Sequence, residues 1–159
     1  MDAPSDNSSL RHTLATLAYR ASRAISDAPA DFATFEVGAP PRTPERILAH
    51  MGDLMDWALS LVEDNQRWNN SEPLPWSDEI ARFFRALEAF DQALTTASLS
   101  AKTTNRLFQA PIADALTHTG QLAMLRRLAG CPIRGENYFV ADIEAGRVGL
   151  DQPPPRKSF

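Results

Sequence analysis

The chain has 159 residues, of which 23% are charged and 43% are apolar, and its formal net charge is −4. This length and composition are typical of one globular domain with a single hydrophobic core. No clustered run of lysine or arginine indicates a nucleic-acid surface, and no apolar run is long enough for a membrane span, so we expect neither partner.

The single cysteine, Cys131, excludes an internal disulfide and is consistent with a reducing compartment. The polar, acidic start of the chain, "MDAPSDNSSL", lacks the pattern of a secretory signal. We therefore expect a cytoplasmic protein. Cys131 follows the C-terminal end of a predicted helix, where the helix dipole disfavours a thiolate, so we expect this thiol to be functionally neutral.

Apolar residues at helical spacing predict a first helix near 9–26. His12 lies off its apolar stripe and is expected to face solvent. Residues 28–43 contain three prolines and a glycine, which predicts a long loop. Thr43 as N-cap and Pro44 at the first helical position then mark the start of a second helix near 44–66.

The second half of the chain contains two further helical patterns. With Ser77 as N-cap, a third helix is predicted near 78–98, and a fourth near 106–129 with Gly130 just past its end. A short helix is expected around 136–144. The proline-rich end of the chain predicts an extended segment on the surface or a disordered one.

Four long helices without a strand signal predict an all-α fold, a four-helix bundle of antiparallel type. We expect a single domain over 1–159, with a core over about 9–130 and a tail over 131–159. A long loop follows the first helix in this interpretation.

Three polar residues stand out against this apolar pattern. Asp114 and His118 are four residues apart in the fourth helix, on the face that also carries Leu122 and Leu125, which is predicted to be buried. His50 lies at the edge of the inner face of the second helix. Two imidazoles and a carboxylate on facing helices suit zinc, nickel or iron(II), and three protein ligands leave room for water or substrate.

Metal-free alternatives explain the same residues. An aspartate and a histidine at this spacing often simply pair on a helix surface. A lone histidine on an apolar face is commonly a hydrogen-bonded core residue.

Two further residues are candidates to support the metal ligands. Gln121 is a candidate to form a hydrogen bond with one of the ligands. Asp53, three residues after His50, is a candidate to orient that imidazole or to ligate in its place, or else a solvated surface residue.

The segments "LAHMGDLMDWAL" (48–59) and "DALTHTGQLAMLRRLAG" (114–130) resemble the second and last long helices of the DinB/YfiT-like metalloenzyme superfamily. The resemblance implies a four-helix bundle, frequent homodimers, and a divalent metal held by one histidine of the second helix and two of the last. His50 matches the first of these ligands and His118 the third. Asp114 occupies the second position, a departure from the three-histidine pattern.

The resemblance also implies chemistry. Characterised proteins that resemble this chain include thiol-dependent transferases and isomerases, so a metal that activates a thiol substrate is one expectation. A non-catalytic bundle, metal-binding or metal-free and dimeric, with a ligand-binding or structural role is the alternative. Hydrolysis by metal-bound water would use the same ligands, with Asp53 as the only evident general base.

Overall fold

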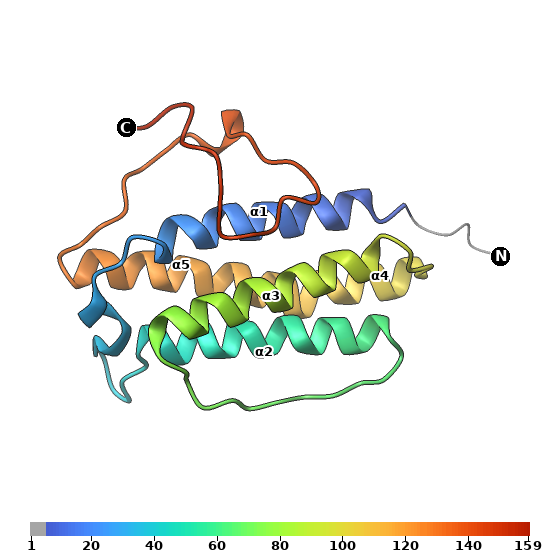
Figure 1. Cartoon of the computed structure of the whole chain (residues 1–159), viewed down its shortest axis with the longest axis horizontal. Helices are drawn as coiled ribbons and strands as arrows, with labels where there is room; N and C mark the ends of the chain where they lie inside the picture. The colour runs from blue at the N-terminus through green and yellow to red at the C-terminus, as the bar shows by residue number, and fades with distance from the viewer. Residues whose placement is uncertain (1–5) are drawn as a thin grey trace.

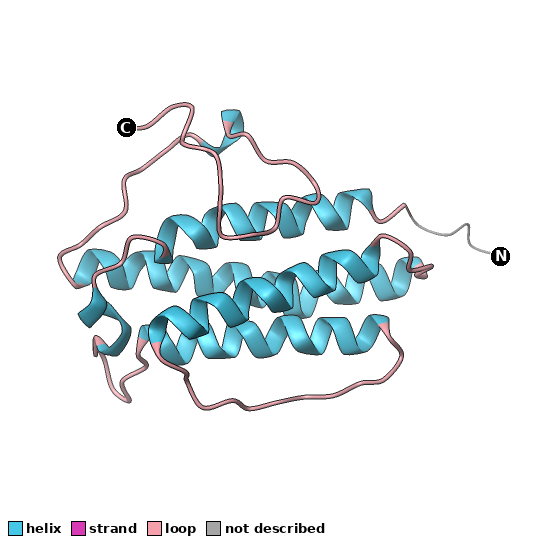
Figure 2. Cartoon of the chain, in the orientation of Figure 1, coloured by secondary structure: helices cyan, strands magenta, loops and turns pink. Residues whose placement is uncertain are grey.

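The chain folds as an all-α four-helix bundle in the computed structural model, which describes residues 6–159 (Figures 1 and 2). Within this range the structure contains no β-strand, and the only extended pairing is an isolated bridge between Glu136 and Ser158. None of the helices over these residues has the length and apolar character that a membrane crossing requires. The predicted fold class is confirmed.

The elements follow one another in this order: α1 (Ser8–Ile25), the 3₁₀ helix η1 (Ala30–Thr34), α2 (Pro44–Val62), α3 (Trp76–Leu94), α4 (Ala101–Leu107), the π-helical η2 (Phe108–Ile112), α5 (Ala113–Leu128) and the 3₁₀ helix η3 (Tyr138–Val140). The last long helix of the bundle is the continuous run of α4, η2 and α5. Pro111 lies in its π-helical turn. A proline has no backbone N–H and clashes with the preceding turn, and a widened turn accommodates both defects.

The predicted boundaries hold at some ends and fail at others. Thr43 and Pro44 begin α2 as expected. Gly130 has a φ of 79°, and the N–H of Cys131 donates to the carbonyl of Arg126 at 2.9 Å, which closes α5 in the predicted way. The expectation of Ser77 as N-cap is wrong, because α3 already begins at Trp76.

Three predicted ends are wrong by several residues. The second helix stops at Val62 rather than near 66, and the third stops at Leu94 rather than near 98. The fourth starts at Ala101 rather than near 106, because the side chain of Ser100 accepts a hydrogen bond from the backbone N–H of Thr103 and so caps a helix start. The helix expected around 136–144 is reduced to the single turn of η3.

The order of directions departs from the antiparallel expectation. α2 and α3 run parallel to each other, and α1 and the α4–α5 helix run the opposite way (Figure 1). Residues 63–75 therefore return along the whole length of the bundle. α2 is about 28 Å long, and a 13-residue segment can span more than this when extended. This crossover segment passes beside α2 and later contributes to the candidate site.

The bundle core is aliphatic and aromatic. α2 packs against both α3 and α5, and α1 does the same from the opposite corner. The largest side chains that are fully enclosed are those of Tyr19, Phe32, Phe83, Phe90, Leu14, Leu17, Ile25, Leu48, Met51, Met55, Leu87 and Leu94. Phe32 comes from η1, so the loop expected over 28–43 contains one turn of helix, and the side chain of Phe32 packs against the core.

The tail over 131–159 lies along α1 (Figure 1). Glu136 is buried and accepts hydrogen bonds from Tyr19 at 2.6 Å and from Arg23 at 2.9 Å, and Arg23 also donates to the Pro153 carbonyl. Burial raises the pKa of the Tyr19 phenol, and its bond to Glu136 adds to the shift. The ion pair between Arg23 and Glu136 thus ties the tail to α1, and the bond to Pro153 holds the proline-rich end, which was predicted to be extended on the surface or disordered.

Candidate metal centre

The three predicted ligands meet at the seam between α2 and α5. His50 comes from the middle of α2, and Asp114 and His118 come from the first and second turns of α5. His50 Nε2 lies 3.3 Å from Asp114 Oδ2, and His118 Nε2 lies 3.4 Å from Asp114 Oδ1. One ligand atom from each of the three residues lies within 4.8 Å of the others. This group can hold a metal ion.

The centre lies at the rim of the bundle rather than in its core. Only 6% of the His118 side chain is exposed, against 25% for His50 and 46% for Asp114. The expectation that Asp114 faces the core is therefore wrong. Residues four apart on a helix differ by about 40° in direction, which is enough to turn Asp114 toward solvent while His118 points inward.

Gln121 fixes the orientation of the buried imidazole. Its Oε1 lies 2.7 Å from His118 Nδ1 and accepts the proton of that nitrogen. A neutral imidazole that donates through Nδ1 has its lone pair on Nε2, the atom that faces Asp114. The predicted role of Gln121 behind a ligand agrees with this contact, and the arrangement matches the way metal-binding histidines are commonly held.

The spacing of the donors fits a shared ion. Two donors that each lie about 2.1 Å from a tetrahedral zinc ion are about 3.4 Å apart. The imidazole–carboxylate distances of 3.3 and 3.4 Å are close to this value, and each involves a different oxygen of Asp114: Oδ2 toward His50 and Oδ1 toward His118. A charge-assisted hydrogen bond between the same groups is about 2.7–2.9 Å long. The three donors can therefore share a metal ion.

Aromatic rings cover one side of the centre. The His50 ring contacts that of His118 edge-to-face at 4.9 Å between centroids, and Trp68 contacts His50 at 5.7 Å. Trp57 in turn supports Trp68 at 5.8 Å. Trp68 belongs to the crossover segment, so the parallel pairing of α2 and α3 places this ring over the site.

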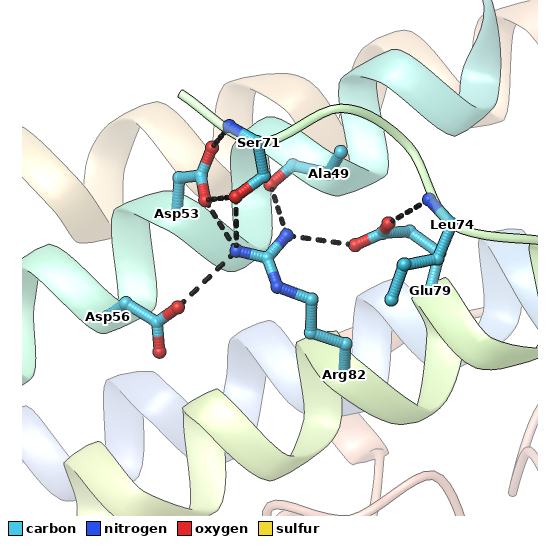
Figure 3. A network of polar contacts seen from close by, with 7 residues as sticks. All are labelled: Ala49, Asp53, Asp56, Ser71, Leu74, Glu79 and Arg82. Atoms are coloured by element: carbon cyan, nitrogen blue, oxygen red, sulfur yellow. Dashed lines mark hydrogen bonds and ion pairs between the residues drawn. The ribbon is translucent and has the colours of Figure 1, made fainter. Parts of the chain in front are cut away.

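Asp53 belongs to a different polar cluster (Figure 3). Its carboxylate accepts hydrogen bonds from the backbone and the hydroxyl of Ser71, and it forms an ion pair with Arg82. Gly52 makes room for this guanidinium, because a Cβ there would lie 3.0 Å from Arg82 Nη1. These contacts explain the near-complete burial of Asp53 and argue against a role as metal ligand, general base or support for His50.

The same guanidinium binds two further acids. Arg82 Nη1 donates to Glu79 at 3.0 Å and to the Ala49 carbonyl at 3.1 Å, and Nη2 lies 3.3 Å from Asp56. Burial raises the pKa of the Asp56 carboxyl, and the charge of Arg82 opposes that shift. The Arg82 cluster, defined as Arg82 with Asp53, Asp56, Ser71 and Glu79, ties the crossover segment to α2 and α3.

Three surface hollows surround the metal centre. Asp114 lines one of about 380 Å³ with Leu54 and Trp57, and His50 lines one of about 190 Å³ with Arg42 and Arg46. A third, of about 300 Å³, lies beside Gln121. The centre is therefore reachable by small molecules.

Sequence reasoning did not identify Trp68, Arg82 or Arg42 near the site. Trp68 and Arg42 lie in loops, where apolar periodicity does not predict which way a side chain points, and Arg82 is one of several arginines on helices.

Comparison with known proteins gives no match, whether with protein families, curated proteins or solved structures.

Proposed function

We propose that the protein is a metal-dependent enzyme that holds one divalent ion with His50, Asp114 and His118. The observation that supports this function is the convergence of one donor atom from each of the three residues, all within 4.8 Å of one another, on a rim that small molecules can reach. A bound ion would supply Lewis acidity to a small molecule held beside it.

The residues of the chain have distinct tasks in this proposal. His118 is the rigid ligand, because it is buried and held by Gln121. Asp114 brings the negative charge that offsets part of the charge of a dication, and its exposure places it on the side that substrate approaches. Trp68 covers His50 and restricts water on that flank.

The resemblance to the DinB/YfiT-like superfamily extends the proposal to the reaction. We propose a thiol-dependent transfer or isomerisation, in which a small thiol is the molecule that the centre activates. The thiol would have to come from the substrate, because the only cysteine of the chain, Cys131, lies just beyond the end of α5, more than three helical turns after His118.

A metal-free bundle with a ligand-binding or structural role is the second candidate. The contact that favours it is the hydrogen bond at 3.3 Å between His50 and Asp114, which can pair the two groups without an ion. In that case Asp114 accepts a hydrogen bond from His50, His118 is held by Gln121, and the three residues bind no metal.

Zinc titration by calorimetry separates the two candidates. We expect one zinc per chain for the natural protein and a loss of affinity of more than about 100-fold for His118→Ala, since removal of a ligand should exceed the effect of removing a group behind one. His12→Ala is the matched control, because His12 is exposed on α1 and should leave binding unchanged. Equal, weak zinc binding by the natural protein, His118→Ala and His12→Ala would favour the metal-free bundle.

Thiol chemistry is then tested directly. The zinc-loaded protein is incubated with a small thiol and an electrophile, and consumption of the electrophile is compared among the zinc-loaded protein, the metal-free protein and His118→Ala. Zinc-dependent consumption that His118→Ala abolishes supports the reaction proposed. Consumption that is equal in all three samples would contradict it.

A further inference from the structure

We propose that the groove beside the metal centre selects a small carboxylate with an apolar arm, and that Arg42 binds the carboxylate. The inference rests on the proposed function for its role, since the carboxylate compound would be the substrate held next to the ion. It names a substrate class and a specificity residue that the metal ligands alone do not define.

Arg42 connects two of the hollows around the centre. It lines the hollow of about 190 Å³ together with His50, and it also lines the hollow of about 300 Å³ together with Gln121. These two residues are a ligand and the partner of a ligand. A molecule held by Arg42 therefore lies within reach of the metal centre from either side.

The charge of Arg42 is available to a ligand. Among residues 6–159 no carboxylate pairs with it, whereas the charges of Arg11, Arg23, Arg82 and Arg126 are each met by an acid within 3.0 Å. Asp53 lines the same hollow, but its carboxylate is already paired with Arg82. Arg46 adds a second positive charge and has only a loose contact, 3.8 Å, with the exposed Glu72. A guanidinium matches a carboxylate through two parallel hydrogen bonds.

An apolar wall stands next to this charge. The larger hollow is lined by Val37, Ile47, Met124 and Leu125 in addition to Arg42 and Gln121. Val37 and Met124 are exposed to 42% and 55%. An apolar arm laid against them would remove this surface from water. The hollow of about 300 Å³ is at the small end of ligand sites.

Hexanoate is the probe, because it combines a carboxylate with a short apolar arm, and hexan-1-ol is its uncharged counterpart. Binding is followed by changes in the amide NMR spectrum of the full chain, in the metal-free and the zinc-loaded state. Arg42→Ala is compared with Arg127→Ala, an exposed arginine of α5 that lines none of these hollows. Both variants remove one positive charge, so a general effect of net charge is equal in the two.

We expect hexanoate to bind more tightly than hexan-1-ol and to bind about tenfold more weakly to Arg42→Ala, with no change for Arg127→Ala. Dependence on Arg42 in either metal state supports the inference. Equal hexanoate affinity of the two variants in both states, or equal affinity of the natural protein for hexanoate and hexan-1-ol, overturns it.

Zinc affinity, measured on the same variants, keeps the two proposals separate. If the protein binds zinc but its affinity for hexanoate does not depend on Arg42, only the proposed carboxylate substrate is ruled out. Hexanoate binding through Arg42 in a protein that binds no zinc removes the metal centre and leaves the carboxylate site in place.

Discussion

The metal centre and the Arg82 cluster are neighbours on α2, where His50 and Asp53 are three residues apart. In the Arg82 cluster the acids are met by partners from the chain itself: both Asp53 oxygens accept hydrogen bonds, and Glu79 binds Arg82 as well as the Leu74 backbone (Figure 3). In the metal centre the donors stand 3.3–3.4 Å apart around a half-exposed carboxylate.

The contrast separates structure from function. Polar groups that are saturated by the chain stabilise one arrangement of the backbone and have no capacity left for a ligand. Metal-ligand atoms that converge at distances too long for strong hydrogen bonds to one another can still bind a ligand. Loss of the first cluster should therefore change stability and loss of the second should change binding.

The largest expected effect on stability is that of Arg82→Ala. It leaves Asp53 and Glu79 buried without their counter-charge, and Glu79 is fully enclosed. Breaking a buried ion pair by removing one partner costs about 3–5 kcal/mol. Unfolding by denaturant measures the change in the free energy of unfolding.

Arg85→Ala is the control for that experiment, because Arg85 is exposed on the same helix. Its free energy of unfolding should change by about 0.5 kcal/mol or less. If Arg82→Ala is no more destabilising than Arg85→Ala, the cluster does not anchor the crossover segment as described.

A smaller effect, on binding rather than on stability, is expected for Gln121→Ala. Without the acceptor at Nδ1 the His118 ring loses its fixed orientation, and zinc affinity should fall about 10- to 100-fold. Gln121→Glu keeps an acceptor and should keep the affinity. Calorimetry gives both values, and Gln92→Ala on α3 is the control. An unchanged affinity for Gln121→Ala would mean that the ring is held by packing alone.

Much of the fold was predictable because the information is local. The apolar period of each helix, the Thr43–Pro44 start and the Gly130 end are determined within a few residues. The parallel run of α2 and α3 is not local. It depends on where residues 63–75 lie, and Ser71 and Leu74 are fixed there by Asp53 and Glu79, partners that become neighbours only after folding.

The candidate metal centre was predictable only in part, for the same reason. The spacing of Asp114 and His118 on one helix indicates a shared face, and His50 followed from the edge of another face. The exposure of Asp114 depends on which way α5 faces its neighbours after folding, which the spacing of residues within one helix does not determine. Trp68 and Arg42 come from loops, whose positions relative to the centre are set by tertiary contacts.

Crystals grown with zinc provide the most direct test of the metal centre, through anomalous diffraction at the zinc edge. We predict one strong peak between α2 and α5, with His50 Nε2, His118 Nε2 and a carboxylate oxygen of Asp114 each about 2.0–2.2 Å away and with at least one ligand from outside the chain. Peaks confined to other carboxylates or to His12 at saturating zinc, with none among these three residues, would contradict it.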